Sequence, residues 1–383
     1  MGTATELGVG IIGHQFMGKA HSQAWLDVAS FFPELGVRPA MRVMCGIGDD
    51  VPQMAARWGW EHSTQDYHEV LARDNVHIVD ICTPNNLHAQ MAADAARAGK
   101  HILCEKPLAL DTAQALDALR AVQDAGVKAQ VAFCYRRCPA AMLARHLVRG
   151  GELGRIFHVR AHYLQSWGTD PQRPLAWRMT REVAGSGAHG DLNAHIIDLA
   201  RHITGLEFLE VCAAAETFVP QRPLPDGSGE RGEVTVDDAL LFLARLEGGA
   251  LASFQASRFA QGHKNDAFIE VGGEHGSVAF AFERMNELRY FDARRPKAVQ
   301  GWTTILATEP SAHPYVAAYW PPGHVIGYEH QFISQARDLL EAVAADRPPW
   351  PDFVDGLRCQ EVLDAALQSA DTRAWVEVER HDV

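Results

Sequence analysis

The sequence predicts two domains: an α/β domain with a doubly wound parallel sheet, and an α+β domain with a large, mainly antiparallel sheet. First, a chain of 383 residues is too long for one ordinary hydrophobic core. Second, short apolar runs alternate with amphipathic helical stretches in the first third. Third, strand-like segments follow one another with few helices after about residue 135. We therefore expect domains at 1–134 and 135–383.

Five short runs of the first domain are apolar throughout, as in strands whose two faces are both covered by helices. They are LGVGIIG (7–13), RVMCGI (42–47), HIVDICTP (77–84), HILCEKP (101–107) and KAQVAFC (128–134). The helices between them are predicted over 17–29, 52–58, 87–98 and 111–125, and Gly59 ends the second of these.

The second domain is predicted from longer strand-like segments at 156–167, 236–259 and 267–282, with Gly248-Gly249 as a hairpin turn. A helix over 191–203 and a C-terminal helical pair over 328–345 and 355–370 complete it. The Pro-rich stretches 219–226 and 348–351 are expected to be surface loops.

Composition excludes several classes of partner. The net charge of −13 argues against nucleic acid, because affinity for phosphate backbones comes from clustered Lys and Arg. The N-terminal apolar run is too short for a membrane or signal segment, so no membrane partner is expected. The seven cysteines form no CxxC pair, which indicates a reduced, cytoplasmic protein.

The segment DLNAHIIDLARH (191–202) carries four polar side chains at i, i+4, i+7 and i+11 of the predicted helix: Asp191, His195, Asp198 and His202. An apolar stripe with the same spacing runs beside them. Gly205 is placed to end the helix, and the glycines at 185–187 give it a flexible start. The pattern leaves open whether the polar stripe faces water or a pocket.

The turn after the first strand resembles the dinucleotide fingerprint G-x-G-x-x-G, with Gln15 in place of the middle glycine. Gly13 would make the turn and Gly18 would allow close helix–strand packing, while the Gln15 side chain must point aside or replace a water at the pyrophosphate. The candidate nucleotide-binding residues here are Gly13, Gln15, Phe16, Met17 and Gly18.

The nucleotide is predicted as NAD or NADP. An acidic residue at the end of the second strand would bind the ribose 2′-hydroxyl, but Cys45 to Gly48 stand there, with Asp49 and Asp50 just beyond. Asp49 is a further candidate for cofactor binding. The absence of an acid at the expected place leaves room for a 2′-phosphate, so both cofactors remain open.

Longer segments carry a resemblance to a known family. DICTPNNLH (80–88), AGKHILCEKPL (98–108) and GSGAHGDLNAHIIDLARHITG (185–205) are similar, in order and spacing, to the glucose–fructose oxidoreductase / inositol 2-dehydrogenase / MocA (Gfo/Idh/MocA) family. The resemblance spans both domains. FMGKAHS (16–22), YRRCPA (135–140), YLQSW (163–167) and PLAWR (174–178) look most like sugar dehydrogenases within it.

The resemblance implies a Rossmann domain joined to an α+β domain whose open sheet makes a dimer or tetramer interface. It implies that Lys106, Asp191 and His195 are catalytic, and that the Lys106-Pro107 bond is cis. It also places Thr83, Pro84, Asn85, His88 and Glu105 at the cofactor, with Lys106.

The three catalytic candidates suit the oxidation of a secondary alcohol with NAD(P)+. His195, whose ordinary pKa is about 6.5, is a natural base for the hydroxyl proton. The ammonium of Lys106 would stabilise the developing alkoxide. Asp191, one turn from His195, would accept a hydrogen bond from a substrate hydroxyl or hold the imidazole and Lys106 in place.

A sugar substrate requires several donors and acceptors and an aromatic wall. The candidates that contact it are Tyr135, Gln165, Trp177, Arg178, Asp191 and His195, the first four from the segments that resemble sugar dehydrogenases. No metal is expected: His189 and His195 are six residues apart on a helix, which puts them on different faces.

Two other functions stay open. Some members of the family cleave glycosides through a transient keto sugar with tightly held NAD+, and that reaction would yield no net NADH. A regulator that senses the cofactor without catalysis should have lost Lys106 or His195, which are both present. The favoured interpretation is a dehydrogenase that acts on a sugar, anhydrosugar or cyclitol.

Overall fold

The computed structural model describes residues 5–383, which fold into two compact units. The first contains the chain up to Cys134 and residues Gly327–Leu357, and the second contains Tyr135–Ile326 and Arg358–Val383. The expected division at 134/135 differs at one place, because residues 327–357 return to the first unit. Helix α10 (Tyr328–Ala344) packs there along α1 (Phe16–Phe31), with the rings of Phe16 and Tyr328 stacked at 6.4 Å.

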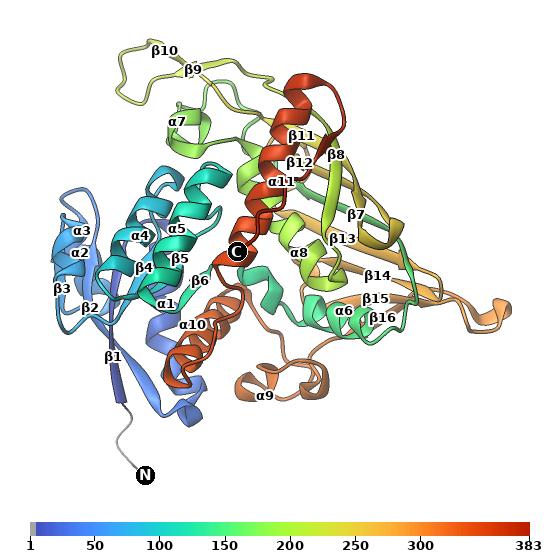
Figure 1. Ribbon diagram of the computed structural model, residues 1–383, viewed down its shortest axis with the longest axis horizontal. Helices are drawn as coiled ribbons and strands as arrows, with labels where there is room; N and C mark the ends of the chain where they lie inside the picture. Colours follow the sequence, from blue (N-terminus) through green and yellow to red (C-terminus); the bar gives the residue numbers. More distant parts are fainter. Residues whose placement is uncertain (1–4) are drawn as a thin grey trace. The chain divides into compact units, whose positions relative to one another are not determined.

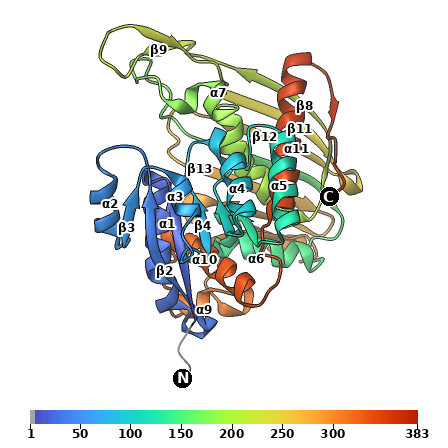
Figure 2. The same ribbon diagram turned by 60° about the vertical axis from the view of Figure 1, so that its left-hand side comes forward.

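The first unit contains the predicted parallel sheet, six strands in the order β3-β2-β1-β4-β5-β6. Its strands are β1 (Thr5–Ile12), β2 (Val37–Cys45), β3 (His62–Thr64), β4 (Ile78–Ile81), β5 (His101–Cys104) and β6 (Ala129–Val131). Its other helices are α2 (Val51–Trp58), α3 (Tyr67–Leu71), α4 (His88–Arg97) and α5 (Thr112–Ala125). Figures 1 and 2 show helices on both sides of the sheet, with α4 and α5 adjacent. The carboxyl ends of the neighbouring strands β1, β4 and β5 therefore share one edge.

The second unit is built on a nine-stranded sheet in the order β16-β15-β14-β13-β7-β12-β11-β8-β17. Its strands are β7 (Ile156–Leu164), β8 (Phe208–Glu216), β11 (Ala239–Leu246), β12 (Leu251–Ser257), β13 (Asp266–Gly273), β14 (Gly276–Ala281), β15 (Glu287–Asp292), β16 (Thr303–Leu306) and β17 (Val376–Glu377). The predicted turn at Gly248-Gly249 is confirmed, with φ values of 70° and 79°. The pair β7–β12 is parallel, so the sheet is mixed and mostly antiparallel.

Helices of the second unit lie against one face of this sheet: α6 (Pro139–Arg149), α8 (Ala194–Thr204) and the later part of α11 (Phe353–Thr372), while α7 (Arg181–Ala184) and α9 (Val316–Tyr319) are short. Burial alternates along β11, which presents Leu241 and Leu243 outward. Leu243 is 54% exposed, and Leu251 of the neighbouring β12 is also exposed. The outer face therefore carries apolar side chains at positions that are usually polar when a sheet faces water.

The Pro-rich stretch 219–226 was expected to be a surface loop, and that expectation is partly wrong. Its residues Gln221–Pro223 form β9, which pairs with β10 (Arg231–Glu233) as a small separate sheet. Arg222 is fully buried because its guanidinium donates to the backbone oxygens of Gly168 and Asp170, at 2.6 and 2.8 Å. In the other stretch, 348–351, Pro349 and Pro351 are buried, so it is not simply a surface loop.

The predicted polar helix is confirmed over Ala194–Thr204, and Gly205 ends it with φ 73°. The turn before it is different, because His189–Asn193 form a π-helical turn, η5. Asp191 therefore does not continue the regular α-helical stripe. The stripe does not face water either: His195, Asp198 and His202 are all buried.

The buried end of this stripe is held by an ion pair between Asp198 of α8 and Arg136. The Arg136 Nε donates to Asp198 Oδ2 at 2.9 Å, and both side chains are about 2% exposed. A buried charge is tolerated when its partner is present, and removing one partner leaves the other charge uncompensated. The pair therefore fixes α8 to the segment that follows Cys134.

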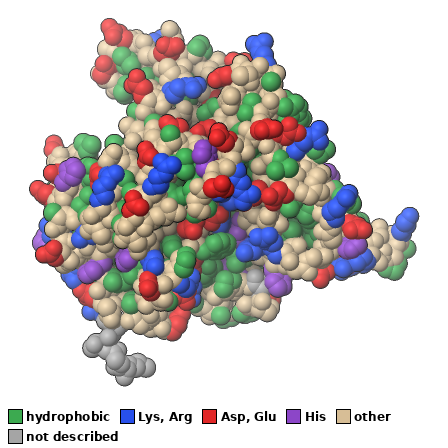
Figure 3. All heavy atoms as spheres, viewed as in Figure 1, with side chains coloured by type: hydrophobic (Ala, Val, Ile, Leu, Met, Phe, Trp, Pro, Cys, Tyr) green, Lys and Arg blue, Asp and Glu red, His purple; other side chains and the backbone are tan. Residues whose placement is uncertain are grey.

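The surface facing the viewer in Figure 3 carries acidic and basic side chains intermixed. Within residues 5–383, no helix is long and apolar enough to cross a membrane.

Asp198→Asn should destabilise the protein by about 3–5 kcal/mol, because it leaves the buried Arg136 without its counter-charge. Chemical denaturation followed by circular dichroism measures the change. The matched control is Asp117→Asn, which removes an exposed partner of Arg120 and should produce no measurable change. Equal stability of Asp198→Asn and the unchanged protein would contradict the role given to this pair.

Candidate active site

The turn between β1 and α1 is closely packed against the end of β4. Gly13 has φ 109°, and a Cβ there would lie 2.4 Å from the backbone oxygen of Cys82. A Cβ at Gly18 would lie 2.1 Å from the Gly13 oxygen. Both positions therefore require glycine, as the fingerprint predicted.

The Gln15 side chain lies against that of His14, while its relation to a pyrophosphate stays a prediction. Its Nε2 lies 2.7 Å from Nε2 of His14, which in turn lies 3.1 Å from Oδ1 of Asp50. Asp49 and Phe16 are exposed and Met17 is half-buried. Gln15, Phe16 and Met17 form the N-terminus of α1, where the helix dipole attracts a phosphate.

The loop after β4 contributes Thr83, Pro84 and Asn85. The hydroxyl oxygen of Thr83 is buried and has no hydrogen-bond partner among residues 5–383. His88, expected at the cofactor, is buried, with its Nδ1 2.7 Å from the Pro107 oxygen and its Nε2 2.9 Å from the Thr83 oxygen. His88 therefore links the loop after β4 to the loop after β5 and supports both.

Glu105 and Lys106 follow β5 at the same edge of the sheet. The Lys106-Pro107 peptide bond is cis, as the resemblance implied. Glu105 is buried; its Oε2 accepts the Lys106 backbone N–H at 3.3 Å, and its Oε1 lies 3.1 Å from Nε2 of His21. Lys106 itself is half-buried.

These features fit a bound dinucleotide. Gly13 and Gly18 permit the tight turn and the close helix–strand packing that bring the N-terminus of α1 to the end of β1, where a pyrophosphate is bound in this fold. The buried Thr83 hydroxyl supplies a polar group that no described residue satisfies. The first unit therefore has the residues that would hold the cofactor.

In the second unit, Asp191 is held by Arg258, which the sequence did not single out. The Arg258 Nη2 donates to Asp191 Oδ2 at 2.9 Å, and its Nη1 donates to the Arg178 backbone oxygen at 3.0 Å. The Arg258 side chain is 3% exposed, whereas that of Asp191 is 27% exposed. The carboxylate of Asp191 thus remains partly accessible, while the buried guanidinium of Arg258 balances its charge.

His195 packs face to face with Tyr135, with ring centroids 4.2 Å apart and planes 13° apart. The Tyr135 hydroxyl lies 2.7 Å from that of Tyr163, which donates to Asn265 Oδ1 at 2.6 Å. Gln165 donates to the same oxygen at 2.8 Å and accepts from Trp167 Nε1 at 2.7 Å. The chain of polar groups therefore fixes the ring against which His195 packs.

The remaining substrate candidates, Trp177 and Arg178, lie together and are half-buried. The Arg178 guanidinium lies 4.2 Å from the Trp177 ring centroid, at cation–π distance. Tyr135 is 5% exposed and Gln165 is bonded at both ends of its amide. Of the four, Trp177 and Arg178 present the accessible aromatic and cationic surface.

The glycine-rich segment before Asp191 is held by hydrogen bonds and a close backbone contact. Asp237 accepts the backbone N–H groups of Gly187 and His189 at 2.7 and 2.8 Å. A Cβ at Gly187 would lie 1.8 Å from the backbone oxygen of Asp237. The glycine therefore permits a close backbone contact that positions the π-helical turn.

The sequence-predicted residues fall into two groups. The nucleotide candidates and Lys106 belong to the first unit, and Asp191, His195 and the other substrate candidates belong to the second. Sequence reasoning missed Arg258, Tyr163, Asn265 and His21. Their partners lie tens of residues away in the chain, and only Arg258, a charged residue directly after an apolar strand, carried a local signal.

Residues 7–133 match the model of an oxidoreductase family with an NAD-binding Rossmann fold, and residues 142–279 match the GFO/IDH/MocA C-terminal domain. Levoglucosan dehydrogenase of Pseudarthrobacter phenanthrenivorans is 40% identical over 97% of this chain and 98% of its own length.

Two solved structures are similar over the whole chain. An oxidoreductase domain protein from Kribbella flavida is 49% identical, with a TM-score of 0.94 over 98% of this chain and all of its own. A levoglucosan dehydrogenase in complex with NADH and levoglucosan is 40% identical, with a TM-score of 0.93 over the same shares. The resemblance inferred from the motifs is confirmed. The chain belongs to the Gfo/Idh/MocA family of NAD-binding oxidoreductases.

Proposed function

We propose that the protein oxidises a secondary hydroxyl of a sugar, anhydrosugar or cyclitol with NAD+, and that levoglucosan is the first substrate to test. The observation that carries the proposal is the pair Asp191 and His195, each fixed by a buried partner, Arg258 and Tyr135. The identity of 40% to a levoglucosan dehydrogenase over nearly the whole chain supports the substrate class.

The proposed chemistry divides the work among three residues. A nicotinamide bound by the first unit would supply the acceptor for the hydride of the sugar carbon. His195 takes the hydroxyl proton, a role for which the imidazole of histidine is suited. Lys106 donates a hydrogen bond to the same oxygen and stabilises its negative charge. Asp191 accepts a hydrogen bond from the sugar, with its own charge balanced by Arg258.

For the sugar we propose contacts with Trp177, Arg178 and Asp191. An aromatic face next to a guanidinium and a carboxylate offers the apolar surface, donors and acceptors that a polyol requires. In this proposal Tyr135 and Gln165 support the residues that contact the sugar and do not contact it themselves, since their polar atoms are bonded within the protein.

We propose NAD rather than NADP as the cofactor. Asp49 and Asp50 lie just beyond the end of β2 and are exposed, and a carboxylate at this place repels a 2′-phosphate. The seven cysteines all lie within residues 5–383 and form no disulfide with one another, which supports a reducing compartment such as the cytoplasm.

We propose that a second copy of the chain covers the outer face of the nine-stranded sheet, giving a dimer or tetramer. Leu241, Leu243 and Leu251 are exposed on adjacent strands of that face. Clustered apolar side chains of this kind are typical of homodimer interfaces.

His195→Ala should lower kcat for levoglucosan oxidation by about 10²–10⁴-fold, because the hydroxyl proton loses its acceptor. The rate is followed by the absorbance of the reduced nucleotide, with NAD+ and NADP+ supplied in separate assays. We expect NAD+ to be preferred. His324→Ala, which changes an exposed histidine, should leave the rate unchanged. Full activity of His195→Ala would contradict the proposed base.

Arg258→Gln should lower kcat/KM for the sugar by about 10²-fold, because Asp191 loses the partner that positions it. Binding of NAD+ should be unaffected, since Arg258 belongs to the second unit. Steady-state kinetics with each substrate varied separates the two effects. Arg380→Gln, which removes an exposed partner of Glu247, is the control. Equal kcat/KM in both variants would show that Arg258 has no such role.

Leu243→Glu should reduce the mass of the particle in solution from that of a dimer or tetramer, because it places a charge in the proposed interface. Light scattering coupled to size-exclusion chromatography measures the mass. Val325→Glu alters an equally apolar side chain, 75% exposed, outside the sheet and should have no effect. A monomeric unchanged protein would refute the proposed interface.

A further inference from the structure

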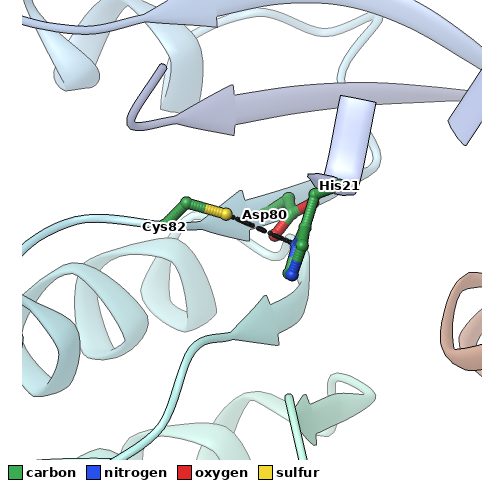
Figure 4. Close-up of side chains that lie close together, drawn as sticks. All are labelled: His21, Asp80 and Cys82. Atoms are coloured by element: carbon green, nitrogen blue, oxygen red, sulfur yellow. Dashed lines mark hydrogen bonds and ion pairs between the residues drawn. The ribbon is translucent and has the colours of Figure 1, made fainter. Parts of the chain in front are cut away.

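Three buried ionisable side chains are bonded in a line beneath the carboxyl ends of β4 and β5. Nδ1 of His21 lies 2.9 and 3.0 Å from the two oxygens of Asp80, and its Nε2 lies 3.1 Å from Oε1 of Glu105. His21 comes from α1, Asp80 from β4, and Glu105 directly follows β5. Figure 4 shows His21 with Asp80 and Cys82. The side chains of His21, Asp80 and Glu105 are each at most 7% exposed.

The geometry fits a protonated imidazole. Both ring nitrogens face carboxylate oxygens, and only an imidazolium can donate from both. Burial by itself would lower the pKa of His21, but the charge and hydrogen bond of Asp80 outweigh it and raise the pKa well above its ordinary value. Trp25 Nε1 donates to Asp80 Oδ2 at 2.7 Å, so this buried carboxylate has several partners.

Among residues 5–383, no second cation contacts the His21 ring. The groups that face His21 are Asp80 and Cys82 at the end of β4, Cys104 and Glu105 at the end of β5, and the ring of Phe332 from α10 at 5.4 Å. Two buried carboxylates without a cation would each carry a large desolvation penalty. His21 is therefore their counter-charge.

One ligand atom each from His21, Asp80 and Cys82 lie close enough together to hold a metal ion. Among residues 5–383, this is the one group of His, Cys, Asp or Glu side chains with that geometry. A metal would need a bare Nδ1 and a thiolate. Nδ1 is at hydrogen-bond distance from both Asp80 oxygens, and burial raises the pKa of the Cys82 thiol, which keeps it protonated. The arrangement is thus explained by protons alone.

Glu105 connects this buried cation to the proposed catalytic lysine. One of its oxygens faces His21, and the other accepts the backbone N–H of Lys106. We propose that His21 is a positioning residue: it orients the carboxyl group of Glu105, and Glu105 in turn fixes Lys106 at the end of β5. This inference rests on the proposed function, in which Lys106 stabilises the alkoxide.

The test compares kcat as a function of pH in four proteins: unchanged, His21→Gln, Glu105→Gln and the double variant. His21→Gln should lose up to about 10²-fold in kcat near neutral pH, because Lys106 is less well placed. Its carboxylates, without a cation, will take up a proton more readily as the pH falls. The variant should therefore show a second acid limb, with activity recovering as the pH rises, in addition to the limb that protonation of the base His195 gives both proteins.

Glu105→Gln should lower kcat without that added limb, and the double variant should be no slower than Glu105→Gln alone, because both changes break one linkage. His101→Gln, at the opposite end of β5, should leave the pH profile unchanged. Thermal melting and NADH binding verify that each variant is folded. Additive losses, or a His21→Gln profile parallel to that of the unchanged protein, would overturn the inference while leaving the dehydrogenase proposal intact.

A direct measurement needs no variant and no substrate. Nuclear magnetic resonance of protein labelled with ¹⁵N-histidine should show one side chain that remains an imidazolium at alkaline pH, where an ordinary histidine is neutral. An entirely neutral set of histidines would overturn the inference whether or not the enzyme oxidises levoglucosan. So would stoichiometric zinc that is lost in Cys82→Ser, because it would make the cluster a metal site.

Discussion

The first unit depends on how closely β1, β4 and β5 approach one another at the centre of the parallel sheet. Parallel pairing in register brings Ile12, Ile81 and Cys104 to one edge, so the loops that follow these strands meet there. The approach leaves no room for a Cβ at Gly13. The nucleotide turn, the Thr83 loop and Lys106 are therefore positioned by backbone pairing, and the side chains beneath them have to satisfy one another.

Buried charge organises both units. In the first, His21 lies between two carboxylates. In the second, Arg136 and Arg258 balance Asp198 and Asp191 on the α8 helix and the turn before it. Each carboxylate is paired because an isolated buried charge is far more costly than a paired one. The polar stripe of this segment is thus explained by partners from other parts of the chain rather than by contact with water.

The sequence was sufficient for elements that depend on local pattern. Apolar runs predicted five of the strands in the first sheet, but His62–Thr64 is too short and polar to stand out. The spacing of Asp191 and His195 predicted a helix, yet a helical period does not reveal a π-helical turn or the close contact between Gly187 and the Asp237 backbone oxygen just before it. Pro-rich composition suggested a loop at 219–226, where burial of Arg222 by backbone oxygens instead produces a short strand.

Site residues were predictable where a motif carries them and not where folding supplies the partner. Lys106 and His195 lie in recognisable segments. Arg258 lies 67 positions from Asp191, and His21 lies 84 from Glu105, so neither pair leaves a periodic trace. The same limit applies to the partners of Tyr135, whose ring packs against His195 and whose hydroxyl bonds Tyr163; its contact with the sugar stays a prediction.

The most direct test of the central claim is the fate of the hydrogen on the oxidised carbon. Purified protein would be incubated with NAD+ and levoglucosan deuterated at its carbon-bound positions, and the nucleotide would be analysed by mass spectrometry. We predict stoichiometric formation of reduced nucleotide that carries deuterium. Turnover of the sugar with the nucleotide recovered as NAD+ would contradict net dehydrogenation and indicate glycoside cleavage through a transient keto sugar.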